Sequence, residues 1–60
     1  MNTKPRVRPI FKPDCEARVM GETIPAMFLG RMKNGLMGYA WIQTAEGVFS
    51  VNVRDLYMVA

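Results

Sequence analysis

The sequence predicts an all-β fold, a small barrel of five short strands preceded by an extended N-terminal arm. Two observations predict it. From residue 14 onward, apolar and polar residues alternate with a period of two, which is the pattern of half-buried strands. Turn residues interrupt this alternation at short intervals, and no stretch of ten residues has a helical period. Short strands joined by tight turns are typical of small barrels.

The first thirteen residues predict a flexible arm. Prolines stand at positions 5, 9 and 13, and each removes a backbone donor and biases the residue before it toward extended conformations. The segment carries four cations and no acid: Lys4, Arg6, Arg8 and Lys12. We therefore expect residues 1–13 to be a basic, proline-containing arm and residues 14–60 to form the folded domain.

The first strand is expected at residues 14–20. Here Cys15, Ala17 and Val19 alternate with charged residues, so these three side chains should point to the buried side of the strand. The tripeptide "GET" at 21–23 is typical of a turn and should end the strand.

The second strand is expected at residues 24–32. Pro25 lies near its start, where a missing donor is tolerated, and Gly30 indicates a bulge or bend. The dipeptide Asn34-Gly35 follows. It is the strongest hairpin signal in the chain, because both residues accept a positive φ angle.

The remaining elements follow in short succession. A third strand is expected at 36–44, a turn at 45–47 and a fourth strand at 48–53. Residues 54–56 are too few for an α-helix and suit one 3₁₀ turn. Residues 57–60 would then form a short closing strand.

The fourth strand indicates which side of the sheet is the core. Phe49, Val51 and Val53 share one face, whereas Val48 and Ser50 lie on the other with Asn52. The continuous apolar face predicts the core side.

The third strand allows two assignments. Ala40 and Ile42 are small or branched and suit a tight interior, which would place Tyr39 and Trp41 outside. The opposite assignment buries the two aromatic residues. We favour the first, because a small barrel has little room for a Trp and a Tyr whose polar ends need partners or water.

From residue 15 to 60 the chain resembles SH3-like small β-barrels. The resemblance lies in the strand order, in the "NG" hairpin and in the ending "VNVRDLYMV", where a 3₁₀ turn precedes the last strand. Within that fold, the "GYA" at the start of a long strand and the V-x-x-L step near the end are similar to plasmid-borne type II dihydrofolate reductases.

The reductase resemblance implies an active pore whose Val-Gln-Ile-Tyr motif would fall on residues 48–51. Only Val48 matches this motif. Phe49 and Val51 stand where the family has Gln and Tyr, so they cannot supply the hydrogen bonds that hold a pterin and a nicotinamide. The sequence therefore departs from the family at its active site.

Other catalytic equipment is not evident in the sequence. Histidine, the usual general base near neutral pH, does not occur. Asp14 and Glu16 share the polar side of a strand, which favours two solvated carboxylates. Cys15 lies among apolar positions and is expected to be a small buried hydrophobe. The sequence "GRMKNG" lacks the ending of a phosphate-binding loop. We expect no catalytic residue, no metal and no cofactor.

The length of the chain predicts that it needs support from a partner. Sixty residues bury a thin core, and small domains usually rely on disulfides, a metal or another subunit. With a single cysteine, no internal disulfide can form. A second copy or a protein partner is therefore expected. No apolar stretch is long enough to span a bilayer or to act as a signal peptide, so no membrane contact and a cytoplasmic location are expected.

The preferred binding surface is an aromatic sheet face. Its candidate residues are Met37, Tyr39, Trp41 and Arg31, which belong to types enriched in protein interfaces. The alternative is that the sheet folds over and Trp41 simply covers the core.

A nucleic-acid interface is the second possibility. Tail and hairpin cations could pair with phosphates while aromatic residues stack on bases. The candidate cations are Lys4, Arg6, Arg8, Lys12 and Lys33. The tail cations could also serve only to keep the chain in solution.

These observations predict a non-enzymatic, self-associating binding or regulatory protein that acts through an aromatic sheet face on a protein partner. Phage-type inhibitors or adaptors are examples of such small viral proteins. A nucleic-acid-binding domain that uses the basic arm is the alternative, and a reductase-like enzyme is the least supported prediction.

Overall fold

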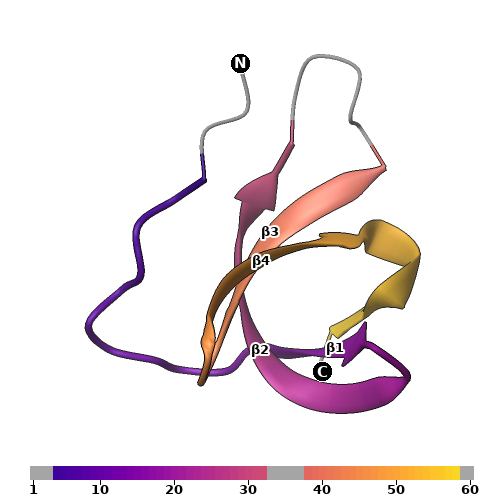
Figure 1. Cartoon of the computed structure of the whole chain (residues 1–60), viewed down its shortest axis with the longest axis horizontal. Helices are drawn as coiled ribbons and strands as arrows, with labels where there is room; N and C mark the ends of the chain where they lie inside the picture. The colour runs from indigo at the N-terminus through magenta and orange to yellow at the C-terminus, as the bar shows by residue number, and fades with distance from the viewer. Residues whose placement is uncertain (1–3, 33–37, 59–60) are drawn as a thin grey trace.

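The computed structural model describes residues 4–32 and 38–58. It contains five strands and one 3₁₀ turn (Figure 1): β1 (Cys15–Val19), β2 (Glu22–Arg31), β3 (Tyr39–Thr44), β4 (Gly47–Asn52), η1 (Val53–Asp55) and β5 (Leu56–Met58). All paired strands are antiparallel, in the order β4-β3-β2-β1-β5. The all-β fold, its five strands and the 3₁₀ turn before the last strand are confirmed. Within the described residues β4 and β5 are the two ends of the sheet, so its closure into a barrel stays a prediction.

Strand β2 connects the two halves of the sheet. Its residues 22–26 pair with β1, and its residues 27–31 pair with β3. The register shifts between Phe28 and Gly30, and Gly30 has a φ of +152°, a conformation that residues with a Cβ rarely adopt. The predicted bulge at Gly30 is therefore confirmed, and it lies within the strand that curves most strongly in Figure 1.

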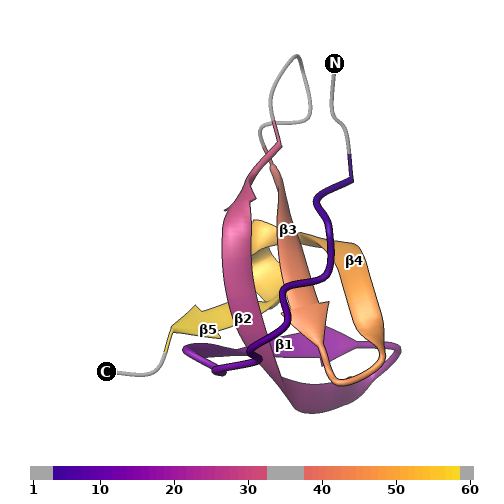
Figure 2. The same cartoon turned by 90° about the vertical axis from the view of Figure 1, so that its left-hand side faces the viewer.

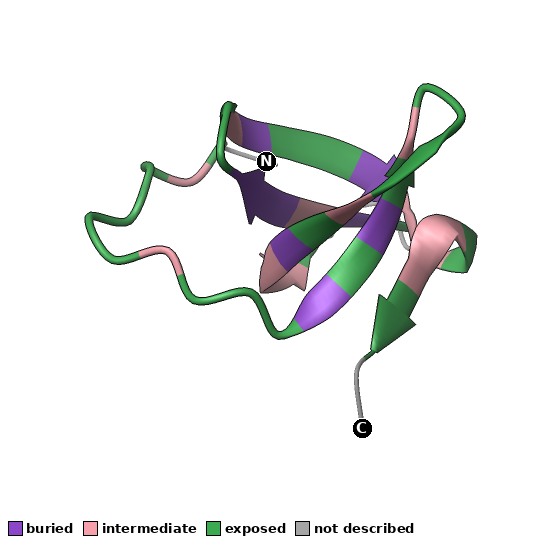
Figure 3. Ribbon diagram, turned by 90° about the horizontal axis from the view of Figure 1, so that it is seen from below, coloured by how far each residue is buried: buried purple, intermediate pink, exposed green. Residues whose placement is uncertain are grey.

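The core lies on the concave side of the sheet. Its buried residues are Cys15, Ala17, Ala26, Ile42 and Val51, with Val19, Phe28 and Leu56 packed against them. Buried and exposed positions alternate along β1 (Figure 3). Ala40 and Ile42 have no solvent exposure, so the expectation that they point inward, with Tyr39 and Trp41 outside, is confirmed.

The fourth strand differs from the prediction. Phe49 was expected in the core, but its side chain is 39% exposed, whereas Val48 on the other face is buried. Because β4 is the last strand of the sheet, a side chain on its inner face can extend past the core. Val48 lies beside Gln43 of β3, on the face along which the N-terminal arm runs.

The turn after β1 is also displaced from the prediction. It consists of Met20 and Gly21, and β2 already begins at Glu22, which pairs with Val19. Both turn residues have positive φ, +51° and +83°, as a two-residue hairpin turn requires. Met is rarely found in that conformation. The sequence therefore predicted a turn at residues 21–23, whereas the turn begins one residue earlier, at Met20.

Most other boundaries agree with the prediction to within one residue. The fourth strand begins at Gly47 and η1 at Val53, one residue earlier than expected in both cases. The third strand begins at Tyr39, and the expected "NG" hairpin turn lies outside the described residues. The described residues contain no helix with the length and apolar character needed to cross a membrane.

Candidate binding surfaces

The outer face of β3 presents two aromatic side chains. Tyr39 is 42% exposed and Trp41 is half-buried. Trp41 pairs with Gly30 on β2 and with Ser50 on β4, so its neighbours on both strands are small. That arrangement leaves room for the indole ring against the outer face of the sheet.

The N-terminal arm is attached to the same face. The backbone N–H of Arg8 donates to Oε1 of Gln43 at 2.7 Å, and Nε2 of Gln43 donates to the Arg8 carbonyl at 3.0 Å. Gln43 is buried, as expected for an amide whose donor and acceptor are both used. Figure 2 shows the described part of the arm running in front of β3.

The arm borders a shallow, open hollow on the sheet. Its volume is about 420 Å³, and its lining residues are Arg8, Pro9, Ile10, Lys12 and Met27. The four arm cations proposed for a nucleic-acid interface are all exposed, and two of them, Arg8 and Lys12, line this hollow. The structure therefore brings arm cations onto the sheet face that carries Trp41. The fifth candidate, Lys33, lies outside the described residues.

Arg31 lies on the opposite face of the sheet from Tyr39 and Trp41. It pairs with the fully buried Ala40, and directly paired residues of antiparallel strands share a face. The structure thus separates Arg31 from the two aromatic residues with which it was grouped. Met37, the fourth member of that group, lies outside the described residues.

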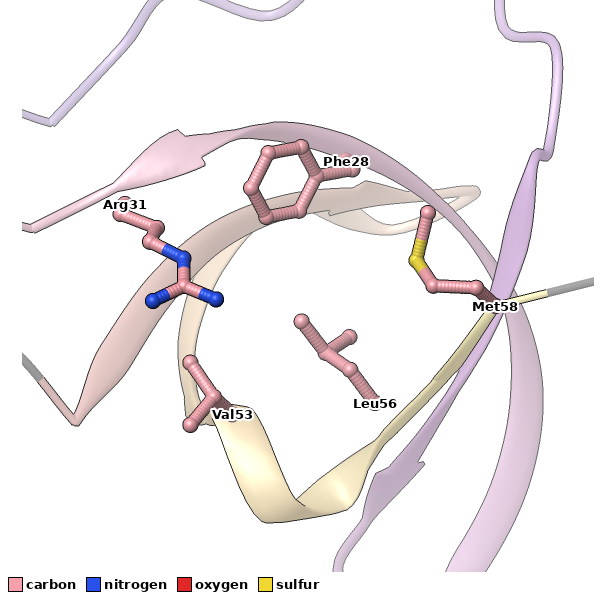
Figure 4. Close-up of a pocket in the computed structure, with 5 residues that line it drawn as sticks. All are labelled: Phe28, Arg31, Val53, Leu56 and Met58. Carbon is pink, nitrogen blue, oxygen red and sulfur yellow. The ribbon is translucent and has the colours of Figure 1, made fainter.

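A second hollow, lined in part by Arg31, lies on the concave side of the sheet. Its volume is about 280 Å³, and four apolar side chains line it with Arg31: Phe28, Val53, Leu56 and Met58. The guanidinium group extends into the space between Phe28 and Val53 (Figure 4). Such a hollow suits an apolar group with an anionic end, because a guanidinium binds carboxylates through paired hydrogen bonds.

Cys15 has the environment of an unreactive thiol. It is buried, and its Sγ lies 3.3 Å from the carbonyl oxygen of Ala26, to which the thiol donates. Burial, together with the neighbouring Asp14, raises the pKa of Cys15 from 9.0 to about 11. The thiol is therefore protonated near neutral pH, and the thiolate is the nucleophilic form.

Asp14 has a structural contact that the sequence did not reveal. Its Oδ1 accepts a hydrogen bond from the Phe28 N–H at 3.0 Å, where the register of β2 shifts. Asp14 was expected to be only a solvated carboxylate beside Glu16. In the structure it supplies an acceptor to the backbone at the bulge.

Gln43 is the residue of this surface that the sequence analysis did not single out. The only signal was a side-chain amide that follows the apolar run "YAWI". Its partner is 35 residues away, so no local pattern could identify it.

Comparison with protein-family models gives no match to this chain. Comparisons with curated proteins and with solved structures give no significant similarity either.

Proposed function

We propose that this chain is a small, non-catalytic binding protein with an SH3-like fold, and that it regulates or inhibits a protein partner by covering part of its surface. The contact surface is the outer face of β3 together with the arm attached to it. The observation that carries this proposal is the exposure of Tyr39 beside the half-buried Trp41. Tyr and Trp are enriched in interfaces because each combines a large apolar ring with a polar end.

The charge distribution favours a partner with an acidic surface. Residues 1–13 contribute four positive charges and no negative charge, whereas residues 14–60 contain four cations and five acids. The excess positive charge is therefore carried by the arm, beside the aromatic face. Charges at the rim of an interface mainly accelerate association and make it sensitive to salt.

The test is capture of a partner from an extract of the source cells, compared between two matched substitutions. Tyr39→Ala removes an exposed tyrosine of the outer face on β3. Tyr57→Ala removes a tyrosine of similar exposure, 48%, from β5 at the other end of the sheet. We expect Tyr39→Ala and Trp41→Ala to reduce the captured partner about tenfold or more, as hot-spot residues do.

The tyrosine on β5 serves as the control, and Tyr57→Ala should capture as much partner as the unchanged chain. Circular dichroism spectra of all variants verify that they are folded. Equal capture by Tyr39→Ala, Trp41→Ala and the unchanged chain would contradict the proposal.

Binding to single-stranded nucleic acid is the second candidate function. It is favoured by the arm cations that lie along the same face as Trp41, since phosphate contacts and base stacking combine in such sites. In that case affinity for an oligonucleotide should fall steeply with salt and should largely disappear when residues 1–13 are removed. Binding that is insensitive to both changes would exclude this function.

A further inference from the structure

Strand β4 is the longer of the two edges of the sheet. Among the described residues its only paired neighbour is β3, with which it forms an unbroken register from Gly47 to Asn52. In Figure 2 it forms the right-hand margin of the sheet, with the arm passing in front of β3. Up to Met58, the last described residue, the opposite edge β5 spans three residues.

The hydrogen-bond pattern shows which backbone groups of β4 point away from β3. The Val53 N–H donates to the Gly38 carbonyl at 2.9 Å, and continuation of the β3–β4 register places these two residues opposite each other. Hydrogen-bonded pairs alternate with non-hydrogen-bonded pairs in antiparallel strands. The backbone N–H and C=O groups of Val51 and Phe49 therefore form hydrogen bonds with β3. The N–H and C=O groups that point outward belong to Val48, Ser50 and Asn52.

This edge lacks the features that protect edge strands. Its sequence "GVFSVN" contains no charged residue and no proline, and its register with β3 has no bulge. Exposed edges of natural sheets usually carry a lysine, a proline, a bulge or a very short strand to prevent pairing. The short described part of β5 offers few backbone groups for pairing with another strand, whereas β4 has six residues and none of these protective features.

We propose that β4 pairs with β4 of a second copy of this chain, antiparallel, about a twofold axis at Ser50. Ser50 of each copy would exchange both backbone hydrogen bonds with Ser50 of the other, and Val48 would lie opposite Asn52 of the second copy. Residues opposite each other share a face, so this register joins outer face to outer face in one continuous sheet.

The side chains of β4 suit this register. Ser50, at the axis, is exposed and small. On the inner face, Phe49 lies opposite Val51 of the second copy, so an aromatic ring that is 39% exposed in the single chain gains an apolar neighbour. A second copy is the favoured occupant because the strand is uncharged, so two copies meet without charge repulsion. A chain of 60 residues also needs additional support.

The dimer goes beyond the proposed function, since the outer face of a single chain could bind a partner. In the dimer both outer faces lie on the same side of the extended sheet. The two Trp41 residues are then separated by three strand spacings, roughly 14 Å. A partner would meet two aromatic surfaces and two arms, which increases avidity without any new type of contact.

The first test measures mass by analytical ultracentrifugation over a range of concentrations. The unchanged chain should reach twice the 6.8 kDa of one chain. Ser50→Pro removes an outward-pointing donor but none of the bonds to β3, so it should weaken dimerisation at least tenfold. Ser50→Thr keeps the donor and should dimerise like the unchanged chain. A chain that remains monomeric at about 1 mM, or Ser50→Pro that dimerises normally, would overturn the proposal.

A second test applies even if the proline variant fails to fold. In a Cys15→Ser background, Ser50→Cys places two thiols at the axis, where Cα atoms of a hydrogen-bonded pair are about 5.5 Å apart, within disulfide range. Asn52→Cys is the matched control on the same face, with its two copies roughly 14 Å apart. Mild oxidation should link the first variant and not the second. Equal linking, or none in either variant, would contradict the register. Partner capture by Tyr39→Ala is measured separately, so failure of one proposal leaves the other testable.

Discussion

At the scale of single residues, the position of Cys15 makes stability depend on pH. The thiol is buried and donates to the Ala26 carbonyl, and its pKa is raised to about 11 from 9.0. The folded chain therefore holds this proton more tightly than the unfolded chain. The associated stability is complete below pH 9 and is lost as the pH rises through about 11.

We predict that the free energy of unfolding falls more between pH 8 and 11 for the unchanged chain than for Cys15→Ala, by about 2 kcal/mol. Urea unfolding at several pH values measures this difference. All other ionisable groups are common to both proteins, so their contributions cancel in the comparison. Parallel pH profiles for the two proteins would show that Cys15 ionises equally in both states.

Met20 is a second residue whose backbone conformation lowers the stability of the folded chain. It occupies the first position of the β1–β2 turn with a φ of +51°, and its side chain is 98% exposed. Because the side chain has little packing to lose, Met20→Asn should stabilise the chain by about 0.5–1 kcal/mol, as Asn-Gly is the favoured pair for this turn. Thermal unfolding gives the measurement. Met20→Leu retains the backbone strain and should leave stability unchanged, and an equal gain for both variants would refute this explanation.

At the scale of elements, the arm and β3 are joined by one side chain. The Gln43 side chain forms hydrogen bonds with both the backbone N–H and the carbonyl of Arg8. These are the two bonds that a residue of a neighbouring strand would form with Arg8. The attachment keeps residues that are otherwise rich in proline and charge against the sheet.

We predict that Gln43→Ala detaches the arm and accelerates trypsin cleavage after Arg6, because the other three arm cations each precede a proline, where trypsin does not cleave. Stability should fall by about 1–2 kcal/mol, the sum of two modest net hydrogen bonds. Gln43→Glu keeps the acceptor for the Arg8 N–H but loses the donor, so its cleavage rate should be intermediate. Identical cleavage of all three proteins would show that the arm is held by other contacts.

At the scale of the whole molecule, the core is small: among residues 4–32 and 38–58, Ile42 and Cys15 are the largest fully buried side chains. So small a core leaves little margin of stability. Pairing through β4 would supply further burial, and any species that binds only the folded state raises its stability by mass action.

The melting temperature of the unchanged chain should therefore rise with protein concentration over about a hundredfold range. Ser50→Pro should melt at a temperature that does not depend on concentration. Differential scanning calorimetry provides both values. If the unchanged chain shows no concentration dependence, its stability does not come from self-association.

The sequence by itself determined the features that depend on local pattern. Alternation identified the buried side of β1, and the sizes of Ala40 and Ile42 indicated which side of β3 faces the core. Gly30 indicated the bulge, because positive φ angles favour glycine. Neighbouring residues alone decide such preferences, so they can be read along the chain.

The tertiary structure decided which residues share a surface. The bulge at residues 28–30 shifts the alternation by one position, so Arg31 points to the concave side and away from Trp41. The edge position of β4 leaves Phe49 partly exposed, and the arm reaches Gln43 across 35 residues. Each outcome depends on which segments lie beside each other in space. Strand registers and contacts distant in sequence therefore set the binding surface, while local periodicity sets the strands that carry it.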